Sequence, residues 1–267
     1  MASMKSMIMG VIDVGSSMGE PLNGTKDTKL SVASSFYSSY VLQRMVASKT
    51  VEFGLVTYGS DMTNNFLNTN QGGYEYVEEV VPMEKPDITS IQYIANIKPG
   101  SGRGDLIDGI VVGQDILNRT NVKKAFNKIL LLITDGETEV EGVEDLETIV
   151  GNMKSIVNFS LYIAMVGKVT PTSSVIKREN AKLLQSLAES IEGRFAEMED
   201  PRDGFYLLAG GAGLGTKPQL LKTTLELAPQ VLPIFYPAFY FICVPRIKLS
   251  FFALADTPGQ NSLPVLE

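Results

Sequence analysis

MIMGVIDVGSS, at residues 7–17, joins an apolar run to a short polar segment that begins at Asp13. An uninterrupted apolar run that ends in an acid and small residues is typical of a parallel strand buried on both faces. The same pattern recurs in VEFGLVTY (residues 51–58), KILLLIT (128–134) and VNFSLYIAMV (157–166). We therefore expect buried strands whose carboxyl ends lead into polar loops.

Segments with helical periodicity separate these strands. In the first of them, apolar side chains recur every three or four residues: Leu30, Ala33, Tyr37, Val41 and Met45. Further helices are expected within residues 104–117, 143–153 and 183–191, with an edge strand at 74–81 and a last strand at 194–198. This alternation predicts an α/β fold with a doubly wound, mostly parallel sheet of Rossmann type.

The character of the chain changes near residue 209. AGGAGLGTKP (209–218) is typical of a linker, and the following residues are rich in Pro, Phe, Tyr, Ile and Val, as in antiparallel strands and turns. We predict an α/β domain at residues 1–209, a linker at 210–218, and the incomplete opening of a β-rich domain at 219–267. A strand pair this short needs further strands or a partner to cover its edges.

Composition excludes several classes of function. The chain has no histidine and a single cysteine, Cys243, so imidazole catalysis, intrachain disulfides and multi-cysteine metal sites are excluded. GGAGLGTK (210–217) lacks the Gly-Lys-Ser/Thr order of a phosphate loop. A binding protein is therefore expected rather than an enzyme. The start lacks the pattern of a signal peptide, and the apolar stretch 231–244 is too short to span a bilayer, so no membrane contact is expected.

Oxygen-bearing side chains follow the predicted strands at the edge where ligands bind in doubly wound sheets. Asp13 and Ser17 follow the first strand, Ser101 lies in a loop before a helix, and Asp135 ends the central strand. The set resembles the metal-ion-dependent adhesion site of von Willebrand A domains, which implies Mg²⁺ held by these four residues. Gly15 stands where that motif has a second hydroxyl. The lost ligand favours a domain without a cofactor, in which the two acids cap loops and helix starts; bound Mg²⁺ is the alternative.

Several segments in order narrow the resemblance to one family. They are DVGSSMGEP (13–21), VEFGLVTYGSD (51–61), IKPGSGRGDLIDGIVVGQDIL (97–117), KILLLITDGETEVE (128–141) and TTLELAPQVLPIFY (223–236). Together they resemble the Ku proteins, in particular the larger subunit, with a von Willebrand A-like domain followed by the start of the Ku β-barrel. The resemblance covers most of the chain.

The resemblance to Ku implies a nuclear, non-catalytic subunit. It would pair with the smaller Ku subunit, bind double-strand DNA ends, and serve non-homologous end joining and telomere maintenance, with this domain docking repair and telomere proteins. Glu137, Glu139 and Glu141 are candidates for docking a basic partner, although a solvated loop explains them too. Arg246 and Lys248 lie one strand step apart and are candidates for DNA phosphates. The alternative function is a metal-dependent von Willebrand A-type module outside DNA repair.

Overall fold

The computed structural model describes residues 5–48, 50–120, 126–209, 221–223 and 249–251. The chain divides into two compact units, residues 1–214 and 215–267. In the second unit, β7 (Leu221–Thr223) pairs with β8 (Leu249–Phe251) in antiparallel fashion. The predicted linker, Cys243, Arg246, Lys248 and most of the predicted β-rich segment lie outside the described residues. The domain limits set from the sequence stay predictions.

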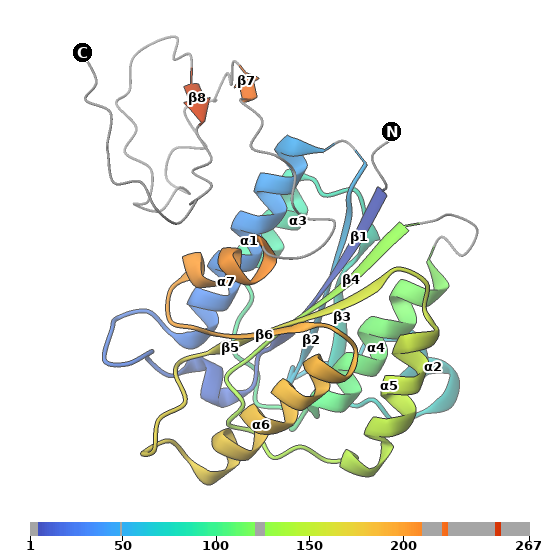
Figure 1. Cartoon of the computed structure of the whole chain (residues 1–267), viewed down its shortest axis with the longest axis vertical. Coiled ribbons are helices and arrows are strands. Elements are labelled where there is room, and N and C mark those ends of the chain that lie inside the picture. Colours follow the sequence, from blue (N-terminus) through green and yellow to red (C-terminus); the bar gives the residue numbers. More distant parts are fainter. Residues whose placement is uncertain (1–4, 49, 121–125, 210–220, 224–248, 252–267) are drawn as a thin grey trace. The chain divides into compact units, whose positions relative to one another are not determined.

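The first unit is built on a six-stranded sheet with the order β3-β2-β1-β4-β5-β6 (Figure 1). Its strands are β1 (Lys5–Asp13), β2 (Glu52–Tyr58), β3 (Val77–Glu84), β4 (Phe126–Thr134), β5 (Phe159–Val166) and β6 (Arg194–Met198). Every neighbouring pair is parallel except β2 and β3. Strand order therefore reverses beside β1, and the predicted doubly wound, mostly parallel α/β fold is confirmed.

Helices cover both faces of this sheet (Figure 1). One face carries α1 (Lys29–Ala47), α3 (Ile88–Ala95) and α7 (Pro201–Ala209), and the other carries α4 (Leu106–Arg119), α5 (Leu146–Ser155) and α6 (Val175–Ser190). Short elements complete the unit: η1 (Ser16–Gly19), α2 (Phe66–Gln71) and η2 (Val143–Asp145). None of the helices within the described ranges has the length and apolar character needed to cross a membrane.

Side chains of β1 alternate between two hydrophobic cores. Ile8 and Ile12 belong to the core under α1, whereas Met9 and Val11 belong to the core under α4. At position 10 only glycine fits, because a Cβ there would lie 2.5 Å from the ring of Tyr37. The central strand is thus buried on both faces, as its apolar sequence predicts.

The structure differs from the sequence prediction at the edges of the unit. Helices α2, α3 and α7 are not predicted, and α6 begins eight residues before the predicted start at 183. Strand β3 begins at Val77 rather than at residue 74, because Tyr74 and Tyr76 have φ values of 53° and 59°, which no strand residue adopts. These two tyrosines form an irregular turn before the edge strand.

Candidate functional site

The carboxyl ends of β1 and β4 and the loop before α4 meet at one edge of the sheet. The hydroxyl of Thr134 donates to Oδ2 of Asp13 at 2.8 Å, and the amide of Gly100 donates to the carbonyl of Val14 at 2.6 Å. The parallel register of β1 and β4 brings their ends together. The structure therefore gathers the three segments that carry the predicted metal ligands.

Asp13 is buried and fully engaged by protein donors. Its carboxylate accepts hydrogen bonds from the amide of Gly15 (2.9 Å), the hydroxyl of Tyr58 (3.2 Å) and the hydroxyl of Thr134. Burial, together with the nearby charge of Asp135, raises the pKa of Asp13 to about 7. Three protein donors therefore occupy the carboxylate oxygens of Asp13.

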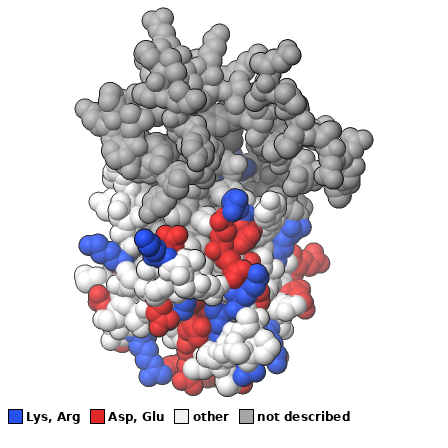
Figure 2. Space-filling view, turned by 90° about the vertical axis from the view of Figure 1, so that its left-hand side faces the viewer, with Lys and Arg blue, Asp and Glu red and all other residues white. Residues whose placement is uncertain are grey.

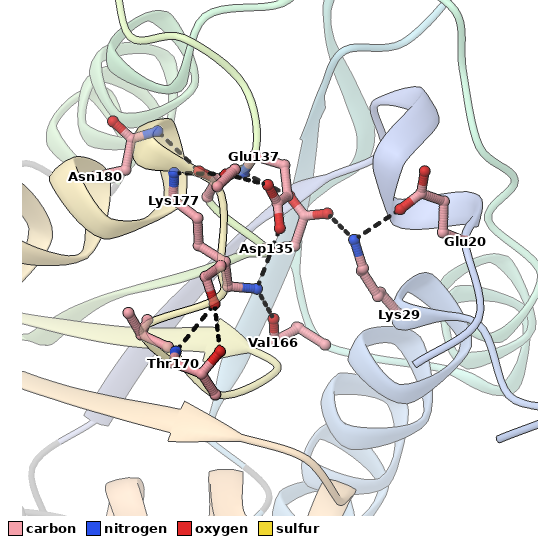
Figure 3. Close-up of polar contacts among 12 residues, drawn as sticks. Glu20, Lys29, Asp135, Glu137, Val166, Thr170, Lys177 and Asn180 are labelled. Atoms are coloured by element: carbon pink, nitrogen blue, oxygen red, sulfur yellow. Dashed lines mark hydrogen bonds and ion pairs between the residues drawn. The ribbon is translucent and has the colours of Figure 1, made fainter. Parts of the chain in front are cut away.

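Asp135 is wholly buried and forms an ion pair with Lys29. Oδ2 of Asp135 lies 2.9 Å from Nζ of Lys29, and the same nitrogen lies 3.2 Å from a carboxylate oxygen of Glu20 (Figure 3). Burial alone would lower the pKa of Lys29, but its hydrogen bond to Asp135 and the charge of that residue raise it. The charge of Asp135 is therefore balanced within the chain.

A second buried lysine lies on the other side of the turn that follows β4. Nζ of Lys177, from α6, donates to the carbonyl of Val166 at 3.2 Å and lies 3.6 Å from a carboxylate oxygen of Glu137 (Figure 3). Glu137 also accepts from the hydroxyl of Ser174 at 2.7 Å, and the side-chain amide of Asn180 donates to the carbonyl of Gly136 at 2.9 Å. The turn that follows β4, at residues 135–137, is thus contacted by Lys29 from α1 and by Lys177 and Asn180 from α6.

The remaining predicted ligands do not complete a metal cage. Gly15 supplies no side-chain oxygen, and exposed Ser101 uses its hydroxyl and its amide to donate to Asp61, both at 2.7 Å. The buried Ser17 Oγ, by contrast, has no hydrogen-bond partner among the described residues and stays free as a ligand. Across the described parts of the chain, no three His, Cys, Asp or Glu side chains are arranged to hold a metal. In this structure Ser101 and Asp135 are occupied by Asp61 and Lys29, and neither is free to hold Mg²⁺ in an adhesion-type arrangement.

A hollow of about 270 Å³ lies beside the start of α4, and its described lining contains several acids and no lysine. We call it the carboxylate pocket and define it by Asp105, Asp108, Glu139, Glu141, Tyr74 and Tyr76. Burial, followed by the charges of Asp105 and Glu141, raises the pKa of Asp108 to about 6. Among the described residues, Arg103 is the one cationic side chain that lines it, and Arg103 pairs with Glu141 at 2.8 Å and is mostly exposed. This pocket has an excess of negative charge.

The three acids predicted to dock a partner separate into two groups. Glu139 and Glu141 are exposed and line the carboxylate pocket, whereas Glu137 is partly buried and held by Ser174 and Lys177. Asp108, a central member of the pocket, is not a predicted site residue. Its only signal in the sequence is an acid in the first turn of a helix, which the helix dipole also explains.

Residues 7–155, more than half of the chain, match the model of the Ku70/Ku80 N-terminal alpha/beta domain. The chain belongs to the Ku family. A Dictyostelium discoideum protein named X-ray repair cross-complementing protein 5 is 28% identical over 204 residues, which are 71% of this chain and 25% of that protein. A rice protein named ATP-dependent DNA helicase 2 subunit KU80 is 28% identical over 137 residues, 51% of this chain and 19% of its own length. These names agree with the predicted resemblance to the larger Ku subunit.

The Ku chain described here spans only about a quarter of these relatives. A third, from Schizosaccharomyces pombe, is named ATP-dependent DNA helicase II subunit 2 and is 24% identical over 207 residues, 73% of this chain and 29% of that protein. Among solved structures, the VWA domain of SpRpn10 aligns with a TM-score of 0.55 and 13% identity, covering 79% of this chain and 96% of that one. The predicted von Willebrand A-like fold is confirmed.

Proposed function

We propose that this chain is the N-terminal part of the larger subunit of a Ku heterodimer that binds double-strand DNA ends. The observation that carries the proposal is the match of residues 7–155 to the Ku N-terminal domain, supported by relatives named for X-ray repair and for Ku80. The whole protein would act in the nucleus, in non-homologous end joining and telomere maintenance, together with the smaller Ku subunit.

The α/β domain itself would dock proteins rather than grip DNA. The chain has a net charge of −7, which opposes binding to a phosphate backbone. On the face drawn in Figure 2, acidic and basic side chains are interspersed over the described residues, whereas a DNA-binding face would carry a basic stripe. DNA contacts would then come from the ring formed by both subunits, for which Arg246 and Lys248 stay candidates.

The carboxylate pocket is the docking surface that the geometry favours. Asp108, Glu139 and Glu141 line one hollow together with the aromatic residues Tyr74 and Tyr76. Asp105 lines it too, but its carboxylate accepts the backbone amides of Ile107 and Glu141. Carboxylates and aromatic faces both bind lysine and arginine side chains. The partner segment would therefore be basic. Of the three acids predicted to dock it, Glu139 and Glu141 line the pocket, whereas Glu137 does not, and Asp105 and Asp108 line the pocket in addition.

The domain would be non-catalytic. Histidine is absent from the chain, and the strand-end acids of the α/β domain are bound to protein donors and to Lys29. The candidate phosphate loop at residues 210–217 lies outside the described residues and departs from the required spacing. The helicase names of some relatives therefore find no support in the residues of this site.

Electrophoretic retardation tests the DNA proposal. The full heterodimer should retard linear duplex DNA regardless of sequence and should bind closed circular DNA much more weakly, because a ring needs an end to thread. The present chain alone should retard neither. Equal binding of the heterodimer to linear and closed circular DNA would contradict the proposed ring.

Fluorescence anisotropy tests the docking proposal on the same heterodimer. A labelled peptide rich in Lys and Arg should bind, and replacing Asp108 and Glu141 by Asn and Gln should weaken its binding by roughly tenfold, since each exposed ion pair contributes up to about 1 kcal/mol. Glu179→Gln, which removes one exposed acid on α6, is the matched control. Equal affinity in all three proteins would exclude the carboxylate pocket.

A further inference from the structure

The chain keeps the two acids of the adhesion-type motif, but one of them, Asp135, pairs with Lys29. Asp13 and Asp135 keep the acids of that motif, and both are almost completely buried, at 1% and 0% exposure. Two buried acids at the end of a sheet repel each other, and either protonation of one acid or a nearby positive charge relieves that repulsion. In this chain Lys29 Nζ, 2.9 Å from Asp135, provides that charge.

The position of Lys29 is opposite to ordinary helix preference. It is the first residue of α1, where the helix dipole disfavours a cation. Its side chain is nevertheless buried and directed at Asp135 and Glu20 rather than at solvent (Figure 3). A buried lysine with two carboxylates within 3.2 Å differs from an exposed surface ion pair, because removing either partner would leave a buried charge unpaired.

The loop before α1 fixes Lys29 in this place. Pro21 and Thr28 form an antiparallel bridge, and the backbone amide of Lys29 donates to the carbonyl of Glu20 at 3.0 Å. The hydroxyl of Thr28 accepts from the amide of Ser31 at 3.0 Å and caps the helix. Backbone contacts therefore hold Glu20 and Lys29 beside each other, and the lysine reaches Asp135 from a fixed base.

We propose that Lys29 is a tethered cation, which supplies from within the chain the positive charge that a bound metal supplies in adhesion-type sites and thereby closes this site to divalent cations. An ammonium has hydrogen-bond donors where a metal has coordination positions, and two of its three donors bind Asp135 and Glu20. Gly15 needs no hydroxyl because no metal requires another ligand. Partner binding through a bridging Mg²⁺ is thereby excluded at this edge.

Thermal unfolding of the full 267-residue chain tests the tethered cation. The variants are Lys29→Met and, as a matched control, Lys26→Met, which removes an exposed lysine from the same loop. Each is measured in millimolar MgCl₂ and in EDTA at matched ionic strength. Lys29→Met should lower Tm by about 10 °C in EDTA, because it leaves a buried carboxylate unpaired.

The response to magnesium separates the outcomes. Wild type and Lys26→Met should melt at the same temperature with and without Mg²⁺. The Tm of Lys29→Met should rise in Mg²⁺, by about 4 °C at roughly ten times the dissociation constant, since the two acids then accept the metal. A rise of Tm for wild type in Mg²⁺, or a Lys29→Met variant that melts like wild type or ignores Mg²⁺, would overturn the proposal.

A second variant covers the case in which Lys29→Met does not fold. Lys29→Met combined with Asp135→Asn removes both charges and keeps the oxygen that accepts from the amide of Glu137 at 3.0 Å. If the unpaired charge causes the loss, the double variant folds and shows no response to Mg²⁺. Failure of the double variant to fold would mean that the ion pair is not the cause, and the proposal would be wrong.

Discussion

Two clusters of acids lie in the loops of this α/β domain, and they differ in what balances their charge. At the end of β4, Asp135 and Glu137 are contacted by the buried lysines Lys29 and Lys177. In the carboxylate pocket, the described residues include no lysine beside Asp108, and exposed Arg103 pairs with Glu141. Lysines therefore balance the first cluster, whereas the second is held by backbone amides at Asp105 and by one exposed ion pair at Glu141, and under the proposed function its remaining acids would meet a basic ligand. A cluster of acids is thus informative about binding only when its internal cations are counted.

The largest effect is expected from breaking the balance at Asp135. Asp135→Asn should lower the free energy of unfolding by about 3 kcal/mol, because buried Lys29 loses its main counter-charge. Adding Lys29→Met should recover a large part of that loss, so the two substitutions are strongly non-additive. Urea unfolding of the four proteins of this cycle measures the coupling. Additive losses would show that the two side chains do not depend on each other.

A smaller loss is expected at the second buried lysine. Lys177→Met should lower the free energy of unfolding by roughly 1–2 kcal/mol, because one charge-assisted hydrogen bond to the carbonyl of Val166 is lost while the ion pair to Glu137 is long, at 3.6 Å. The same urea titration provides the comparison. A loss as large as that for Asp135→Asn would place the main counter-charge of the β4 turn on α6 rather than on α1.

The smallest effect on stability is expected in the carboxylate pocket, and its size depends on pH. The pKa of Asp108 rises from its ordinary 3.8 to about 6, first through burial and then through the charges of Asp105 and Glu141. The stability that this carboxyl group contributes is therefore complete below pH 3.8 and is lost as the pH rises through about 6. The stability of Asp108→Asn relative to wild type should accordingly increase from about pH 4.5 to about pH 7.5, two values on either side of that pKa. A constant difference in Tm across this range would contradict the shifted pKa.

Much of the fold follows from local sequence. The buried strands at residues 7–12 and 128–134 were predictable because a strand covered on both faces must be apolar throughout. Helices α2 and α3 are short, at six and eight residues, and their few apolar positions give weak periodicity. The turn at Tyr74 and Tyr76 was not predictable because neither residue type favours positive φ.

The candidate site was predictable only in part. Asp13 and Asp135 follow strands, and the topology of a doubly wound sheet brings such positions together. Lys29 lies 106 residues before Asp135 in the sequence, and nothing in the local pattern joins them. The one local signal is a lysine at the start of a helix, where an acid is favoured. Tertiary charge compensation, rather than any motif, decides what this site can bind.

The most direct measurement is the affinity of a peptide rich in Lys and Arg for the Ku heterodimer, determined in MgCl₂ and in EDTA at matched ionic strength. With docking carried by the acids of the carboxylate pocket and not by a bridging metal, the dissociation constant should be the same in both buffers. Loss of peptide binding in EDTA, with recovery on adding Mg²⁺, would contradict the account.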